Sequence, residues 1–190
     1  FALALAYYGA GRLGLALAIP PDYATGIFPA SGLAVAGALL WRGFGLAGVW
    51  LGSFVLHIDP SWDGSMAGAH LRSSLVAGSI ASGAAAQAFV AAYLVRRWVG
   101  FPHALDTGPS VAKALLSSGP LACALNALWG PLSLLYAGAL SAREFAGTAF
   151  SWWIGDTLGV VVALPIALTF LAEPRSVWRR RRTTVALPML

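Results

Sequence analysis

Long hydrophobic runs, separated by short polar or proline-containing breaks, dominate this sequence from its first residue. Such runs are typical of helices that cross a membrane, since about 20 apolar residues span its hydrocarbon core. We predict six spans, at residues 1–19, 27–41, 44–58, 73–95, 111–140 and 145–172. The runs at 27–41 and 44–58 are short for a full crossing, so we expect a tight hairpin or a partly broken pair there. The predicted fold class is all-α and integral to the membrane: a polytopic bundle of about six transmembrane helices, some short or broken by proline.

The basic residues divide unequally between the two sides that six spans define. One side holds nine: Arg42, Arg96, Arg97, Lys113, Arg175 and the four arginines at 179–182. The other side holds Arg72 and Arg143, and Arg12 falls inside the first span. Because cytoplasmic loops carry an excess of Lys and Arg, we expect both ends of the six-span domain to be cytoplasmic.

Composition agrees with a membrane protein. Hydrophobic residues make up 58% of the chain and charged residues 10%, against about 25% charged in an ordinary soluble domain. The net charge of +5 comes from residues at the ends of hydrophobic runs, so it does not indicate nucleic-acid binding. Small residues recur four positions apart in several runs, for example Gly48 with Gly52 and Gly155 with Gly159. This spacing predicts close packing of neighbouring helices.

Asp156 is the most informative single residue, because it is a lone carboxylate within the long apolar run 145–172. A carboxylate near the bilayer centre costs about 2.5–3.5 kcal/mol on insertion scales, which favours a functional role with a partner. The alternative is a structural carboxylate that joins two helices. Arg12 lies at a similar depth in the first run, so we expect the two charges to pair. A side chain of Arg12 that reaches to the membrane surface is the competing interpretation.

Other polar, aromatic and proline residues in the runs are candidates for ligand binding or signalling. Asn126 is an intramembrane amide that we expect to form a hydrogen bond between helices. Trp152 and Trp153 fit either an aromatic belt at the interface or the wall of a ligand site. Pro165 should kink its helix near Val161, because it lacks the backbone N–H that would bond there.

The sequence offers little equipment for catalysis. The spans contain no nucleophile–base pair, glycine-rich phosphate loop or pair of carboxylates. The outer surface around the end of the third run, with interfacial His57 and the loop residues Asp59, Asp63 and His70, holds residue types that bind transition metals. Their spacing matches no established motif, so we expect a solvated loop and predict neither a metal site nor a cofactor.

Two motifs resemble a known family. The first is Phe28-Pro-Ala-Ser-Gly-Leu-Ala-Val-Ala36, followed by Gly43 and Gly48, and the second is Trp152-Trp-Ile-Gly-Asp156 with Gly159 and Pro165. Together they resemble the first family of membrane-associated sensor domains (MASE, type 1). These domains are the multi-span input modules of bacterial histidine kinases, diguanylate cyclases and related signalling proteins. The resemblance covers nearly the whole chain, and Trp-x-x-Gly-Asp-x-x-Gly with the later proline is its strongest part.

The resemblance implies a non-catalytic sensory domain in the bacterial inner membrane, surrounded by lipid. It further implies an unknown small-molecule or protein signal, an attached output module and a homodimer formed through that module. We therefore divide the chain into a sensor-like domain at 1–172, a basic cytoplasmic linker at 173–182, and the truncated start of a further hydrophobic segment at 183–190. Two alternatives remain open: uptake or capture of a small molecule by a site between helices, and a purely structural anchor or docking module.

Overall fold

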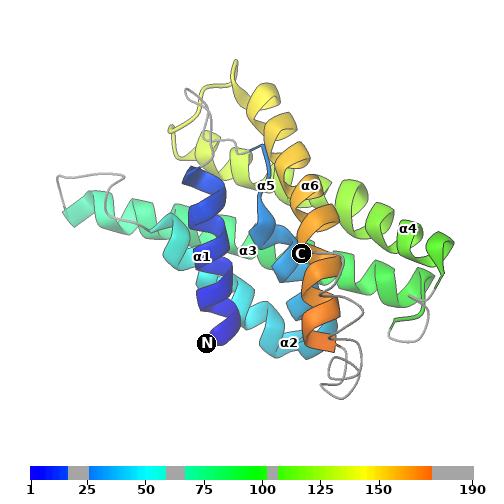
Figure 1. The fold of residues 1–190 in the computed structure, drawn as a ribbon. Coiled ribbons are helices and arrows are strands. Elements are labelled where there is room, and N and C mark those ends of the chain that lie inside the picture. The colour runs from blue at the N-terminus through cyan, green and yellow to red at the C-terminus, as the bar shows by residue number, and fades with distance from the viewer. Residues whose placement is uncertain (17–25, 59–66, 102–106, 173–190) are drawn as a thin grey trace.

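The computed structural model describes residues 1–16, 26–58, 67–101 and 107–172 of the chain. All the regular structure in these ranges is helical (Figure 1). The elements are α1 (Ala2–Ala16), α2 (Pro29–His57), α3 (Ala67–Trp98), α4 (Gly108–Leu116), η2 (Ser117–Leu121), α5 (Ala122–Tyr136) and α6 (Phe145–Ala172). The predicted all-α fold is therefore confirmed.

Four helical regions are long and apolar enough to cross a membrane: Pro29–His57, Leu71–Trp98, Gly108–Tyr136 and Phe145–Leu171. The described part of α1 is shorter, at 15 residues. Because α4, η2 and α5 follow one another without a break, the described ranges contain five helical regions. The expected count of six is thus not confirmed, and the difference lies in α2, which combines the two short runs.

α2 contains a sharp turn at Arg42, whose backbone has φ 50° and ψ −123° while the flanking residues are helical. The chain folds back there so closely that a Cβ atom on Gly45 would overlap the carbonyl oxygen of Gly37. In a straight helix those two residues would be about 12 Å apart. The two arms of α2 diverge from this turn (Figure 1). The arrangement fits the broken pair that the short runs predicted. Arg42 is the break, and the chain is helical both before and after it.

Arg96, near the end of α3, stabilises the turn in α2. Its Nη2 atom donates hydrogen bonds to the carbonyl oxygens of Ala38 and Leu39, at 2.9 and 2.8 Å. Carbonyl groups in the last turn of a helical arm have no partner within the helix, and a cation is favourable at that end. Sequence reasoning had assigned Arg96 only to a cytoplasmic loop.

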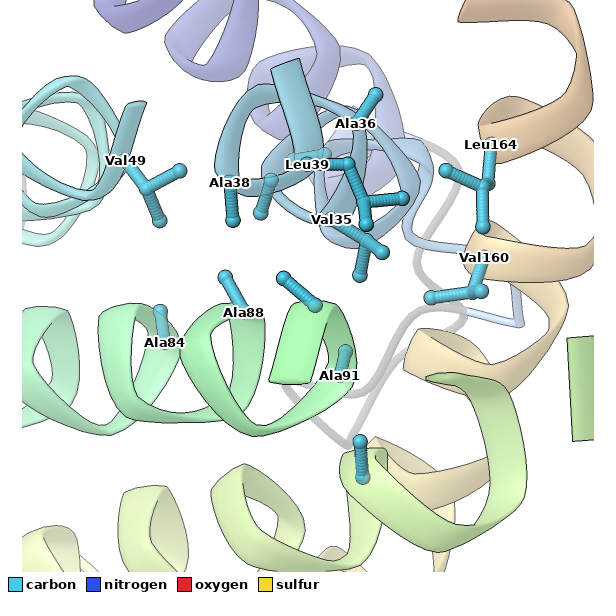
Figure 2. Close-up of a cluster of buried hydrophobic side chains, with 14 of the residues drawn as sticks. Val35, Ala36, Ala38, Leu39, Val49, Ala84, Ala88, Ala91, Val160 and Leu164 are labelled. Carbon is cyan, nitrogen blue, oxygen red and sulfur yellow. The ribbon is translucent and has the colours of Figure 1, made fainter. Parts of the chain in front are cut away.

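The centre of the bundle is packed with small side chains. α2 packs against α1, α3 and α6, and α3 packs in turn against α5. Figure 2 shows Val35, Ala38 and Val49 of α2 facing Ala84 and Ala88 of α3, with Val160 and Leu164 of α6 close by. Short side chains allow these helices to approach closely, as the small-residue spacing predicted. A Cβ atom on Gly52, for example, would lie 2.7 Å from the carbonyl oxygen of Ala4 in α1.

The helical region from Gly108 to Tyr136 contains a π-helical segment, η2, around Pro120. Proline has no N–H to donate, and π-helical turns occur where a helix accommodates such an interruption. The carbonyl oxygen of Pro120 accepts a hydrogen bond from the indole Nε1 of Trp153 at 2.7 Å. η2 is thereby tied to α6, which it also packs against.

Candidate functional site

The two motifs that carry the family resemblance lie against each other, although they are more than 100 residues apart in sequence. The backbone N–H of Phe28 donates to the carbonyl oxygen of Gly155 at 2.9 Å. The hydroxyl of Ser31 donates to the carbonyl oxygen of Asp156 at 2.8 Å. The start of α2 is therefore hydrogen-bonded to the middle of α6.

Glycines in both motifs make this approach possible. A Cβ atom on Gly32 would lie 2.6 Å from the carbonyl oxygen of Gly159, and one on Gly159 would overlap the carbonyl oxygen of Phe28. Any side chain at these positions would push α2 and α6 apart. Gly32 of the first motif and Gly159 of the second are thus explained by one contact between helices.

Asp156 projects from α6 into the interior of the bundle, and 5% of its surface is exposed. The amide Nδ2 of Asn126, on α5, donates to its Oδ2 atom at 3.3 Å. The predicted hydrogen bond of Asn126 between helices is therefore present, and it falls on the candidate carboxylate. The side chain of Asn126 is itself buried, with 6% of its surface exposed.

A cavity borders Asp156, with a volume of about 50 Å³ open to the centres of water-sized molecules. By the same measure a single water needs about 10–15 Å³, so the space suits a few water molecules or a ligand of a few heavy atoms. Helices α1, α2, α3, α5 and α6 all contribute to its wall. The lining residues are Tyr7, Leu15, Phe28, Ser53, His57, Ile80, Ala84, Asn126, Trp152, Gly155 and Asp156.

The α2 side of the cavity carries Ser53 and His57, one helical turn apart. The Nδ1 atom of His57 donates to the carbonyl oxygen of Ser53 at 2.7 Å. This bond places the ring proton on Nδ1 and leaves Nε2 as an acceptor in the neutral ring. Tyr7, on α1, lines the same cavity. Tyr7 also packs edge-on against Phe28, with ring centroids 6.2 Å apart.

The two predicted tryptophans have different surroundings. Trp152 lines the cavity, and the six-membered edge of its indole fits against Gly130 of α5, where a Cβ atom would overlap the ring. Trp153 is bound to Pro120 instead and does not line the cavity. Of the two predicted roles, the wall of a possible ligand site fits Trp152 only.

Two predicted site residues lie elsewhere. Arg12 is exposed on α1, and no hydrogen bond or ion pair joins it to Asp156 in the described part of the chain. The partner of the Asp156 side chain is Asn126, so the described contacts do not support the expected Arg12–Asp156 pair. Pro165 lies nine positions after Asp156 within α6, and its carbonyl oxygen accepts a hydrogen bond from Thr169 at 2.8 Å. The kink expected near Val161 remains a prediction.

The site also includes residues that sequence reasoning missed. Tyr7, Ser53 and Phe28 had not been singled out as polar or aromatic lining, and His57 had been placed at the membrane interface beside a solvated loop. The four-residue spacing of Ser53 and His57, which places both on one helix face, was a usable signal. Of the residues considered for a metal, Asp59 and Asp63 lie outside the described ranges. Within those ranges no group of three His, Cys, Asp or Glu residues could hold an ion.

Several buried polar atoms have no hydrogen-bond partner in the described structure. They are Oδ1 of Asn126, Nε1 of Trp152, Oε1 of Gln87 and Oγ1 of Thr157. Two of these belong to residues that line the cavity. Buried polar groups are almost always paired, so these atoms are exceptions within the described structure.

Comparison with known proteins identifies a family. The family model MASE1 matches residues 1–188 of the chain. No curated protein and no solved structure matches it.

Proposed function

Because this chain belongs to the MASE1 family of membrane-associated sensor domains, we propose that it binds its signal in the cavity beside Asp156 and transmits it through α6. The domain is a sensory part of an integral membrane protein and is not itself catalytic. The observation that carries the proposal is the position of Asp156. It is buried on the last described helix, at the contact between the two family motifs and at the wall of a cavity.

We infer that the domain lies in the inner membrane of a bacterium with both ends in the cytoplasm. The distribution of basic residues supports this orientation. Two described contacts are consistent with it, since each joins helix ends assigned to one side. Arg96 binds α2 beside the turn at Arg42, and Arg72 donates a hydrogen bond to the carbonyl oxygen of Ala137 after α5. A reporter fused after Arg182 should behave as cytoplasmic and one inserted near Gly64 as periplasmic, and reversed labelling would contradict the orientation.

We further propose that α6 leads, through the basic segment 173–182, to a C-terminal histidine kinase or diguanylate cyclase module that forms a homodimer. Basic residues beside anionic headgroups contribute about 1 kcal/mol each, which would hold the exit of α6 at the membrane surface. A helix with a ligand site in its outer half and an anchored inner end is suited to transmit a displacement.

Replacing Asp156 in the full-length protein tests the function. Asp156→Asn keeps the size of the side chain and removes the negative charge, and we expect stimulus-dependent output to be lost while the amount in the membrane stays normal. Ser133→Ala is the control, because Ser133 forms a hydrogen bond with Ser79 outside the cavity. Full stimulus response in Asp156→Asn would contradict the proposal.

Uptake or capture of a small molecule is the second candidate, favoured by the cavity between helices. Transporter sites are typically built at the unwound part of a broken helix. The break in α2 lies at Arg42, which does not line the cavity. The sensory function therefore agrees better with the geometry. Accumulation of a labelled molecule in vesicles that contain this protein alone would favour uptake.

A further inference from the structure

We propose that the cavity beside Asp156 binds a small organic ammonium cation. The positive nitrogen would lie at the carboxylate, and the apolar part of the molecule would lie against aromatic rings. This inference rests on the sensory function proposed above and names the chemical class of its signal.

The first argument is the environment of the carboxylate. Asp156 is buried, and the one described hydrogen bond to its side chain is the 3.3 Å contact from Asn126 to Oδ2. None of the residues that line the cavity with Asp156 is a lysine or an arginine. Buried carboxylates in membrane proteins are normally paired, so a cationic ligand is the chemistry that this group lacks.

The second argument is the aromatic wall. Tyr7, Phe28 and Trp152 line the same cavity as Asp156, and they come from α1, from the residue that precedes α2, and from α6. The faces of aromatic rings attract cations within about 6 Å, and most strongly where water is excluded. Aromatic rings combined with one carboxylate are suited to an organic cation, which has both a charge and apolar surface. Calcium or magnesium would instead need about six or more oxygen ligands.

The third argument is hydrogen bonding and size. Oδ1 of Asn126 is a buried acceptor without a partner, and it belongs to the same amide group that contacts Asp156. The N–H groups of an ammonium ion can donate to the carboxylate, whose Oδ2 atom already accepts a hydrogen bond from the Asn126 amide. The 50 Å³ of space matches an amine of about two to four heavy atoms.

Ethylammonium is a suitable probe, with ethanol as its neutral counterpart and sodium as an inorganic cation. The full-length protein in lipid nanodiscs should show a saturable rise in its thermal unfolding midpoint with ethylammonium chloride. Neither ethanol nor sodium chloride at equal ionic strength should produce that rise. Equal stabilisation by sodium would overturn the organic ligand, and equal stabilisation by ethanol would overturn the role of charge.

Two variants test the contacts. Asp156→Asn should weaken apparent ethylammonium affinity by about thirtyfold or more, because the charge partner is lost. Phe28→Leu keeps the carboxylate and removes one ring, so it should weaken affinity by about two- to thirtyfold. Phe44→Leu is the matched control, since the side chain of Phe44 is 91% exposed and outside the cavity. Unchanged affinity in either cavity variant would overturn the proposed binding mode.

The outcomes separate this inference from the sensory function. If Asp156→Asn abolishes stimulus-dependent output but no probe stabilises the protein, the ammonium class is wrong and the sensory site stands. If ethylammonium binds through Asp156 but output ignores Asp156→Asn, the ligand class stands and the sensory role is wrong.

Discussion

Gly159→Ala tests the contact on which the site depends, because it adds a single methyl group where α2 meets α6. The new Cβ atom would overlap the carbonyl oxygen of Phe28 and lie 2.6 Å from the hydroxyl oxygen of Ser31. Comfortable separations between such heavy atoms are about 3.5–4.0 Å, so the start of α2 must move by about 1 Å or more. That movement stretches the bonds from Phe28 to Gly155 and from Ser31 to Asp156, now 2.9 and 2.8 Å.

The expected loss of stability follows from these contacts. Forcing extra volume into a packed interior costs about 1–3 kcal/mol. Hydrogen bonds between membrane helices contribute about 0.6 kcal/mol each on average, so two of them add about 1 kcal/mol. The free energy of unfolding should therefore fall by about 2–4 kcal/mol. Alanine is a better helix former than glycine by up to about 1 kcal/mol, which brings the value toward the lower end.

Gly147→Ala is the matched control, because it makes the same change in the same helix where no atom lies within 4 Å of the added Cβ. It should be neutral or stabilising by up to about 1 kcal/mol. Both free energies can be measured by titration with sodium dodecyl sulfate in mixed micelles, followed by far-ultraviolet circular dichroism. If Gly159→Ala were as stable as Gly147→Ala, the close contact between α2 and α6 would be refuted.

Two further predictions concern the turn in α2 and the inner half of α6. Arg96→Met should lower the free energy of unfolding by about 2–4 kcal/mol, because two carbonyl groups of α2 lose a charged donor, whereas exposed Arg97→Met should change it by less than about 0.5 kcal/mol. Equal effects of the two variants would exclude the capping role. Pro165→Ala in the full-length protein should leave expression near normal and fix the output high or low regardless of stimulus, and normal stimulus-dependent output would show that Pro165 serves packing alone.

Much of the helical structure was predictable, because membrane spans are encoded by local hydrophobicity. The runs at 73–95, 111–140 and 145–172 correspond to helical regions at Ala67–Trp98, Gly108–Tyr136 and Phe145–Ala172. The turn in α2 was foreseen only as one possibility for two short runs. Its capping by Arg96 was not, since nothing local to 27–58 indicates that a residue of α3 supplies the hydrogen bonds.

In the candidate site, single residues could be predicted from the local sequence, but their partners could not. Asp156 was identified because burying a charge in an apolar helix is costly. Asn126 was identified because amide side chains within a membrane usually form hydrogen bonds. Choosing the partner required knowing which helices touch. Arg12 matched Asp156 in depth and charge, but α5 packs against α6 and places Asn126 at the carboxylate. Tyr7 carried no sequence signal, because aromatic residues are ordinary in apolar helices, and Phe28 was noted only as the first residue of a family motif.

The geometry of α6 also predicts the direction of the signal. Trp152, Gly155, Asp156 and Gly159 recur at helical spacing and so share one face, which lines the cavity and also receives the start of α2. Phe28 belongs to both regions, so a ligand between Phe28 and Asp156 acts directly on the α2–α6 contact. At Gly159 the backbones already touch, which means that the two helices can separate but cannot move closer.

Under the proposed function, an occupied cavity should therefore correspond to the separated arrangement, and Gly159→Ala should imitate the ligand. A bias of about 2–4 kcal/mol changes an equilibrium about 30- to 900-fold. An arrangement populated at 1% without stimulus would rise to between about one quarter and nine tenths. Without stimulus, the output activity of Gly159→Ala should therefore reach between about one quarter and nine tenths of the stimulated level. The output activity of Gly147→Ala should stay at the resting level. A Gly159→Ala protein that folds normally but remains fixed at the resting output would show that separation of α2 and α6 is not the transmitted change.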